Sequence, residues 1–182
     1  MAVEIEAKLK VDSHNRIVER LTELGAEFLQ EQLQKDFHFD DVRRTLSKTD
    51  RCLRLRRQME GREEKIFLTY KGPKEKSKLK RRKEFEFEVK DADAAQKLLS
   101  ALGYEKILCI EKKRRLWRLG ECELALDELP LLGSFVEIEG PDEKTIADVQ
   151  ENLGLSLLSH IPKSYAALTK NELRRRNSET EL

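Results

Sequence analysis

Hydrophobic and charged residues alternate strictly near the start of the chain, in the stretch VEIEAKLKV. The apolar positions are Val3, Ile5, Ala7, Leu9 and Val11, and the charged positions between them are Glu4, Glu6, Lys8 and Lys10. Side chains of a β-strand point alternately to its two faces. The pattern therefore predicts a strand over 3–11 with one apolar and one charged face.

The same two-residue period recurs along the chain and predicts seven more strands. They are expected over about 35–41, 51–58, 64–72, 81–89, 105–120, 122–129 and 134–140. Apolar residues at helical spacing predict helices after Asp12-Ser13, from Asp91 or Asp93 to Leu102, from Pro141-Asp142 to Leu153, and over about 163–174. Gly25, Gly103 and Gly154 are expected to end the first three. Residues 42–50 are expected to form a loop with a turn of helix, and the lysine-rich residues 74–80 a loop.

These elements predict an α+β fold in which the strands pair antiparallel, in a meander with helical insertions. Eight such strands can close into a small barrel, which removes exposed strand edges. If the apolar faces filled the barrel, the apolar stripes of the helices would have no surface to cover. One interpretation is therefore an eight-stranded antiparallel β-barrel, a tunnel with a charged interior, flanked by helices. The alternative is an ordinary sheet whose charged face meets solvent.

Composition limits the classes of protein. The 182 residues include 36 Lys and Arg against 35 Asp and Glu, and a near-neutral total argues against a simple nucleic-acid binder. No apolar run approaches the roughly 18 residues of a membrane span, and no signal peptide is recognised, so we expect neither a nucleic-acid nor a membrane partner. Three cysteines without metal or disulfide spacing indicate a reduced, cytoplasmic protein.

A charged lumen would have a chemical use, because crowded charges persist where they neutralise each other or a ligand. Arginine and lysine suit a polyanion, and carboxylates suit a hard divalent cation such as Mg²⁺. The basic candidates are Lys8, Arg54, Arg56, Lys71, Arg82, Lys113 and Arg115, and the acidic ones are Glu4, Glu6, Glu137, Glu139 and Asp127. On the strand 105–120, Lys112 and Arg114 occupy the opposite face from Lys113 and Arg115. Together the candidates suggest a site for a metal–polyphosphate complex. Of the three histidines, His14 and His160 look incidental, whereas His38 is kept as a candidate substrate contact.

With these residues the sequence resembles the CYTH superfamily, the triphosphate tunnel metalloenzymes. The hallmark Glu-x-Glu-x-Lys is matched by Glu4 to Lys8. The resemblance continues in family order through TDRCLRLRR, LTYKGP, RKEFEFEV, EKKRRLW, LALDELPLLGSFVEIEG and KSYAAL, over about residues 1–170. LTYKGP and LDELPLLGSFVEIE look most like the class IV adenylate cyclase branch.

The resemblance implies a role for each candidate. Glu4, Glu6, Glu137 and Glu139 would bind Mg²⁺ or Mn²⁺ with support from Asp127. Lys8, Arg54, Arg56, Lys71, Arg82, Lys113 and Arg115 would hold the triphosphate, and Lys163 would close one end. Glu84 and Glu86 would serve a second metal or orient the basic groups. Glu4, Glu6, Lys8 and Arg115 are the residues expected to act in catalysis.

The expected function is metal-dependent conversion of ATP to cyclic AMP and pyrophosphate, a lyase reaction. Two alternatives remain: hydrolysis of tripolyphosphate or thiamine triphosphate, and a non-catalytic module that binds polyphosphate or nucleotide. The expected organisation is a single domain over 1–174 with a charged tail over 175–182. A homodimer is compatible with the resemblance, but the sequence does not decide it.

Overall fold

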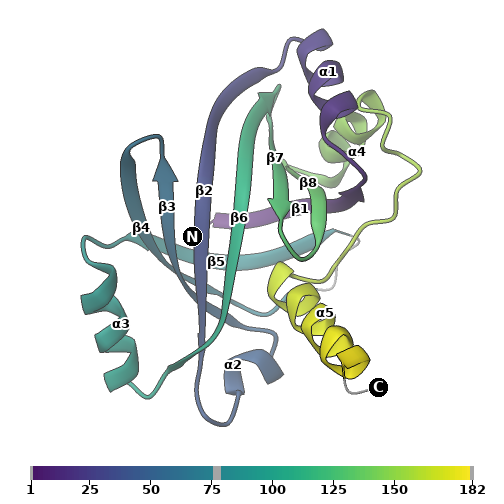
Figure 1. The fold of residues 1–182 in the computed structure, drawn as a ribbon. Coiled ribbons are helices and arrows are strands. Elements are labelled where there is room, and N and C mark those ends of the chain that lie inside the picture. Colours follow the sequence, from purple (N-terminus) through teal and green to yellow (C-terminus); the bar gives the residue numbers. More distant parts are fainter. Residues whose placement is uncertain (1, 76–78, 181–182) are drawn as a thin grey trace.

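Eight antiparallel strands form a closed ring in the computed structural model, and five helices lie around it (Figure 1). The structure describes residues 2–75 and 79–180, and for residues 2–4, 80 and 179–180 it describes the backbone alone. The strands are β1 (Ala2–Val11), β2 (Glu27–Asp40), β3 (Cys52–Glu60), β4 (Glu63–Lys71), β5 (Lys80–Glu88), β6 (Glu105–Leu119), β7 (Cys122–Leu129) and β8 (Gly133–Glu139). The helices are α1 (Asn15–Glu23), α2 (Thr45–Lys48), α3 (Ala92–Ala101), α4 (Glu143–Asn152) and α5 (Tyr165–Thr180). The predicted α+β barrel is confirmed.

The order of the strands differs from the predicted meander. Around the ring it is β1-β5-β4-β3-β2-β6-β7-β8, so β1 lies between β5 and β8 and not beside β2. The long strands β2 and β6 pair over most of their length, from Glu27 opposite Arg118 to Asp40 opposite Glu105. Strands close in sequence often pair, but ring closure requires long-range pairs that alternation alone does not specify.

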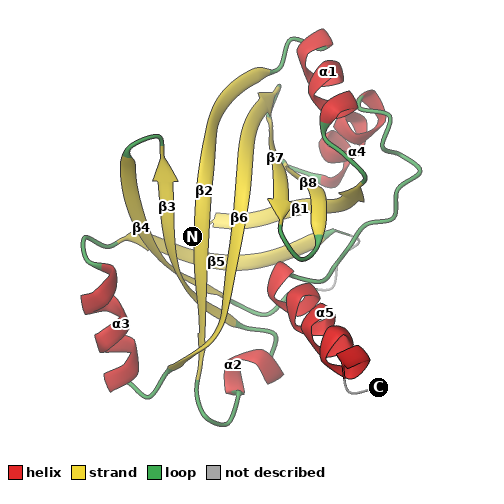
Figure 2. Ribbon diagram, viewed as in Figure 1, coloured by secondary structure: helices red, strands yellow, loops and turns green. Residues whose placement is uncertain are grey.

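The apolar faces of the strands point outward, beneath the helices. Leu9 of β1 and Ile138 of β8 are fully buried in a core with Ile17 of α1 and Ile146 of α4. These two helices lie together at one end of the barrel (Figure 2). A second core joins Leu55 of β3 and its neighbours to α3. The charged faces consequently line the interior, and the interpretation of a solvated charged sheet is wrong.

Helix α5 covers an apolar part of the same interior. Phe135 shares a face of β8 with Glu137, and its ring centre lies 5.2 Å from that of Tyr165 in an edge-on contact. Ile110 and Leu129 complete this small core with α5. The helix continues to Thr180, through residues that the sequence predicted as a tail after 174.

The ends of the helices follow local chemistry. Asp91 caps α3 by accepting hydrogen bonds from the amides of Asp93 and Ala94, and Gly103 ends this helix at a φ of +86°. The cap predicted at Asp12-Ser13 is wrong, because α1 begins after His14, which makes no side-chain cap.

Strand β2 begins eight residues before the predicted start. Residues 27–34 contain three glutamines, which gave no clear alternation of apolar and charged positions. Gln32 and Gln34 are buried, and the Gln34 amide donates to the side-chain oxygen of Gln58 over 2.7 Å. The Gln34 amide nitrogen also donates to the side-chain oxygen of Gln32, whereas the buried side-chain oxygen of Gln34 has no hydrogen-bond partner among the described residues.

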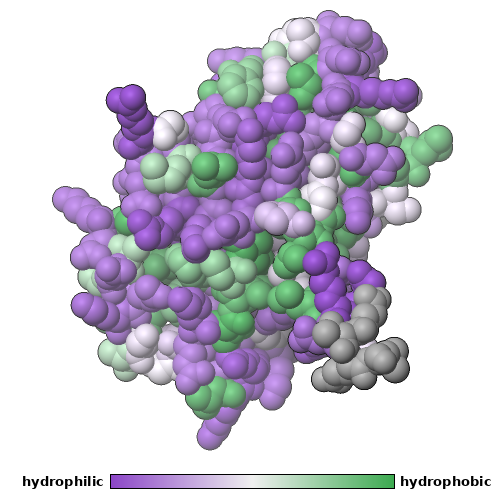
Figure 3. Space-filling view, in the orientation of Figure 1, coloured by the Kyte–Doolittle hydropathy of each residue, from purple (hydrophilic) through white to green (hydrophobic). Residues whose placement is uncertain are grey.

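Among the described residues, no helix is both long and apolar enough to cross a membrane. The face shown in Figure 3 is mostly hydrophilic, with hydrophobic residues in separate groups.

Candidate triphosphate site

A cavity of about 940 Å³ lies inside the barrel, lined by charged side chains from most of its strands. The acidic lining residues are Glu6, Asp36, Asp50, Glu84, Glu86, Glu137 and Glu139. The basic ones are Lys8, Arg51, Arg54, Arg56, Lys71, Arg82, Lys112, Arg114 and Lys170. Ten of the predicted site residues are thus brought together: Glu6, Lys8, Arg54, Arg56, Lys71, Arg82, Glu84, Glu86, Glu137 and Glu139. The side chain of Glu4 lies outside the described residues, although its backbone pairs with Arg82.

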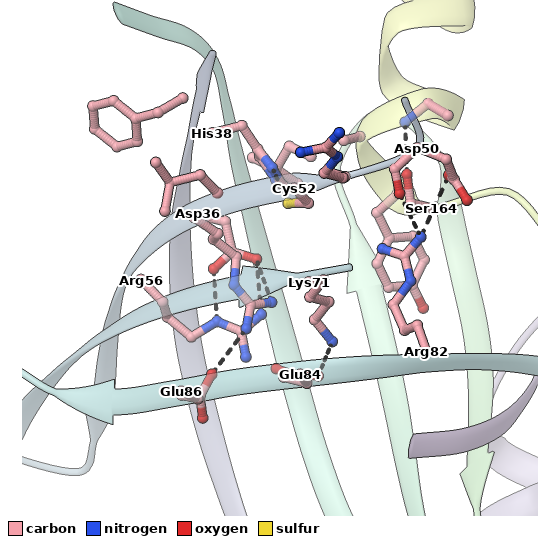
Figure 4. Close-up of a pocket in the computed structure, with 18 of the residues that line it drawn as sticks. Asp36, His38, Asp50, Cys52, Arg56, Lys71, Arg82, Glu84, Glu86 and Ser164 are labelled. Carbon is pink, nitrogen blue, oxygen red and sulfur yellow. Dashed lines mark hydrogen bonds and ion pairs between the residues drawn. The ribbon is translucent and has the colours of Figure 1, made fainter. Parts of the chain in front are cut away.

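Buried carboxylates hold the guanidinium groups of β3 in place. Asp36 of β2 accepts two hydrogen bonds from Arg56, over 2.6 and 2.8 Å, and lies 3.7 Å from Arg54 (Figure 4). Burial alone would raise the pKa of Asp36, but Arg56 and Arg54 outweigh it and hold this pKa well below its usual range. Asp36 therefore stays ionised and fixes two arginines with their remaining donors available to a ligand.

Glutamates of β5 pair with basic residues on the neighbouring strands. Glu86 lies 3.2 Å from Arg54 and accepts a hydrogen bond from Thr69, and Glu84 lies 2.6 Å from Lys71. Figure 4 shows Glu84 and Lys71 pointing toward each other. This geometry agrees with an orienting role for the two glutamates, which remains a prediction.

Lys8 connects β1 to β8 and to α5. Its ammonium lies 3.0 Å from Glu137 and 4.1 Å from the centre of the Tyr165 ring, and it donates to the backbone oxygen of Lys163. The side chain of Lys163 is exposed and does not line the cavity. The prediction that the Lys163 side chain closes one end of the tunnel is therefore wrong. Only the backbone oxygen of Lys163 contacts Lys8.

The face of β6 was assigned the wrong way round. Lys112 is 3% exposed in the cavity, whereas Lys113 is 43% exposed and pairs with Glu31 on the outer face. Arg115 likewise lies outside the cavity, beside His14 and Glu128. Because β6 has basic residues on both faces, the alternation of residue types could not show whether Lys112 and Arg114 or Lys113 and Arg115 point inward. Trp117 packs with the outer core and lies on the same strand face as Lys113. This apolar residue was the feature of the sequence that could have identified the outer face of β6.

Asp127 supports the basic wall and does not line the cavity. It is fully buried, and both of its oxygens accept hydrogen bonds from Arg114 while Lys112 lies 3.4 Å away. With both oxygens engaged by cations, the predicted metal role of Asp127 does not fit this placement. Burial and the neighbouring Arg114 lower the pKa of Lys112 to about 7, although Asp127 opposes the shift.

The remaining carboxylates fit a divalent cation only in company with a ligand. No three acidic, histidine or cysteine side chains of the described residues form a group able to hold a metal. Glu6 and Glu139 are nevertheless paired across β1 and β8, on the walls of a cavity rich in arginine and lysine groups. Mg²⁺ is commonly held by one or two carboxylates plus substrate phosphates. The oxygen donors present thus fit Mg²⁺ or Mn²⁺ bound together with a triphosphate.

Several cavity residues were not selected from the sequence. Asp36, Lys112, Arg114 and Tyr165 all lie within the charged wall, and Asp50 pairs with Arg82 over 3.4 Å. A lone Asp36 in the segment KDFHFDD gives no distinguishing signal, because its arginine partners come from another strand. The positive φ of Asp50, +54°, is visible only in the folded chain.

Eight antiparallel strands closed in a ring, with arginine, lysine and carboxylate groups together in the interior, define a tunnel-like α+β fold. Residues 2–165 match the CYTH domain model, and the chain belongs to the CYTH family.

Known proteins agree with this assignment. A Methanocaldococcus jannaschii protein, provisionally named an adenylate cyclase, is 33% identical over 149 residues, covering 82% of this chain and 81% of its own. Adenylate cyclase CyaB of Aeromonas hydrophila is 27% identical, covering 93% of this chain and 90% of its own. A solved structure of a Pyrococcus horikoshii protein superposes with a TM-score of 0.81 at 30% identity, covering 93% of this chain and 99% of that one.

Proposed function

We propose that the protein is a metal-dependent enzyme that processes a triphosphate, and that it converts ATP to cyclic AMP and pyrophosphate. The observation that carries the proposal is the presence of both charge types in one cavity inside the barrel. A simple anion binder has no use for Glu6 and Glu139 among its basic groups. The names of the Methanocaldococcus and Aeromonas relatives support the cyclase over a hydrolase.

The basic wall would hold the triphosphate in a fixed, extended arrangement. Arg54 and Arg56 are held by Asp36, so their remaining N–H groups are already positioned to donate hydrogen bonds to phosphate oxygens. Lys8 and Arg114 approach from the other side, each paired with Glu137. Phosphoryl and nucleotidyl transfer depend mainly on such positioning and on neutralising oxygen charge.

Glu6 and Glu139 would hold Mg²⁺ or Mn²⁺ together with the phosphates. When bound, such a cation neutralises phosphate oxygens and lowers the pKa of an attacking hydroxyl. In a cyclase the ribose 3′-hydroxyl attacks the α-phosphorus and pyrophosphate leaves. In a triphosphatase water attacks the γ-phosphorus, and the same side chains would bind the substrate.

Product analysis tests the proposal. The protein is incubated with Mg²⁺ or Mn²⁺ and, separately, with ATP and tripolyphosphate. Cyclic AMP with pyrophosphate is the expected result. Free phosphate from either substrate would replace the cyclase with a triphosphatase. Binding without any product would leave a non-catalytic module.

A further inference from the structure

Two basic residues of the cavity lining differ from the others because no carboxylate neutralises them. The other basic lining residues each lie within 3.4 Å of a carboxylate oxygen: Lys8, Arg54, Arg56, Lys71, Arg82, Lys112 and Arg114. Arg51 and Lys170 line the same cavity, but among the described residues neither forms an ion pair. These two side chains therefore keep their full positive charge for a ligand.

Both cations lie at the end of the cavity near α2. Arg51 directly precedes Cys52, the first residue of β3, whose Sγ atom lies 3.4 Å from the Nδ1 atom of His38. Lys170 of α5 is near the same histidine. Burial is the main cause that lowers the pKa of His38 to about 4, and the charge of Lys170 adds to the shift. Arg51 is exposed and Lys170 is partly exposed, so a ligand can reach them from solvent.

Arg82 is held at this end by Asp50, the neighbour of Arg51. The guanidinium of Arg82 donates to the backbone oxygen of Asp50 over 3.3 Å and lies 3.4 Å from its carboxylate (Figure 4). The same carboxylate is shared with Lys74, whose backbone amide and ammonium lie 2.9 and 3.0 Å away. The buried Nε atom of Arg82 has no hydrogen-bond partner among the described residues. A buried donor without a partner is costly, which favours an acceptor supplied by a ligand.

The placement of these cations suits the end of a phosphate chain. Arg51 lies five positions before Arg56, a span of up to about 17 Å in an extended chain. Basic groups therefore follow the cavity wall from the buried pair of Arg56 and Asp36 to an exposed end. The terminal phosphate of a triphosphate has more negative charge near neutral pH than the internal phosphates, because it alone has a second ionisable oxygen. Cations without carboxylate partners match this most highly charged group.

We propose that Arg51 and Lys170, together with Arg82, bind the terminal phosphate of the triphosphate at the α2 end of the cavity. Arg51 would donate two hydrogen bonds to phosphate oxygens, and the ammonium of Lys170 would act as a point charge. Neither Arg51 nor Lys170 was among the site residues expected from the sequence. The inference rests on the proposed triphosphate function and assigns the residues that distinguish a nucleoside triphosphate from a diphosphate.

Binding measurements on two nucleotides test the assignment. The affinities of the full-length protein for α,β-methylene ATP and α,β-methylene ADP are measured by calorimetry in EDTA, so that neither ligand turns over. The two ligands differ only in the terminal phosphate. We expect Arg51→Ala and Lys170→Ala each to weaken the triphosphate about 10-fold, the scale of one charged contact, and the diphosphate less than about 2-fold.

Lys48→Ala in α2 and Arg176→Ala in α5 are the matched controls. Each removes one positive charge at an exposed position that does not line the cavity, and Arg176 pairs with Glu172 on the surface of α5. Because solvent and salt screen exposed charges, these variants should change either affinity by less than about 2-fold.

The melting temperature and the affinity for the diphosphate report whether a variant is folded. Equal weakening of the two nucleotides in folded Arg51→Ala and Lys170→Ala, or an unchanged affinity for the triphosphate in both, would overturn the assignment. If the unmodified protein bound neither nucleotide, the proposed function would fail first, and the assignment with it.

Discussion

Individual carboxylates in the barrel interior have different tasks, set by what surrounds them. Asp36 and Asp127 are buried against guanidinium groups and hold them in position. Glu139 lines the cavity wall and pairs with Glu6 on the neighbouring strand. Removing a buried partner leaves an uncompensated charge, which is strongly destabilising, whereas changes at the cavity wall act mainly on ligands.

Glu139→Gln should abolish turnover while the melting temperature stays within a few degrees of that of the unmodified protein. The amide keeps the size of the side chain but loses the charge that would hold a cation. Mn²⁺ binding in the presence of tripolyphosphate, followed by electron paramagnetic resonance, should weaken in parallel. Glu111→Gln on the outer face, where Glu111 pairs with Lys35, should change neither. Near-normal rates in Glu139→Gln would remove the metal assignment.

Lys112→Met and Lys113→Met form a matched pair on adjacent positions of β6. Only Lys112 faces the cavity, so only its loss should weaken tripolyphosphate binding, by about 10-fold or more for one charged contact. Calorimetry measures both affinities. The reverse result, with Lys113 dominant, would mean that β6 presents its other face to the ligand.

His38 should make the free energy of unfolding depend on pH. Its folded pKa of about 4 lies below the ordinary 6.5, so between these values the unfolded chain binds a proton that the folded chain does not. Stability should therefore fall as the pH is lowered from 6.5 to 4, by up to about 3 kcal/mol from this group alone.

Urea unfolding of the protein and of His38→Gln at several pH values measures this contribution. The variant should lose less stability on acidification than the unmodified protein. Curves that stay parallel between pH 6.5 and 4 would show that His38 titrates normally in the folded state.

At the scale of elements, the short helix α2 is fixed to the end of β2 by one buried carboxylate. Asp40 accepts hydrogen bonds from the amides of Asp41, Leu46 and Ser47, and its exposed fraction is 0%. The segment after α2 carries Asp50 and Arg51 into the cavity. A single side chain thus positions a loop that forms part of the site.

Asp40→Ala should lower the free energy of unfolding by about 3 kcal/mol, because several amides lose their acceptor at once. Asp41→Ala, which removes one exposed acceptor for the Thr45 amide, should cost about 1 kcal/mol. Urea denaturation measures both. A cost for Asp40→Ala no larger than that for Asp41→Ala would show that α2 is held by other contacts.

Across the whole molecule, the side chains that stabilise the fold and those proposed to bind the ligand lie on opposite faces of the same strands. The cores under α1, α3 and α4 contain most of the buried apolar side chains, while the interior concentrates charge around a cavity and has only a small apolar core, under α5. A barrel with this division can change its interior with little effect on the packing outside.

Leu21→Ala tests this division. Leu21 of α1 is fully buried in the outer core, and its truncation should lower the free energy of unfolding by about 2–5 kcal/mol. The affinity for tripolyphosphate should stay within about 2-fold under conditions where the variant is folded. Leu157→Ala, at a side chain 99% exposed, is the control and should change neither quantity. A large loss of affinity in folded Leu21→Ala would indicate that the outer core shapes the cavity.

Much of this arrangement could be predicted from alternation. In β1, Lys8 and Leu9 are adjacent and therefore point to opposite faces of the strand. Because the helices cover the apolar face, the charged face has to point inward. The Glu-x-Glu-x-Lys motif and Arg54 and Arg56 were found for this reason. Which face of a strand a side chain occupies depends only on its position along that strand. A single strand with one charged and one apolar face is therefore enough to assign its side chains to the two faces.

The sequence by itself determined most of the elements, the two-faced strands and the collection of candidate phosphate-binding residues on their charged sides. The tertiary structure decided the order of the strands, the inward face of β6, the buried partners Asp36 and Asp127, and the level at which His38 meets Cys52. The physical reason is the distance along the sequence over which each interaction acts. Alternation acts between neighbours in the chain, whereas barrel closure, register and ion pairing depend on residues from strands far apart in sequence.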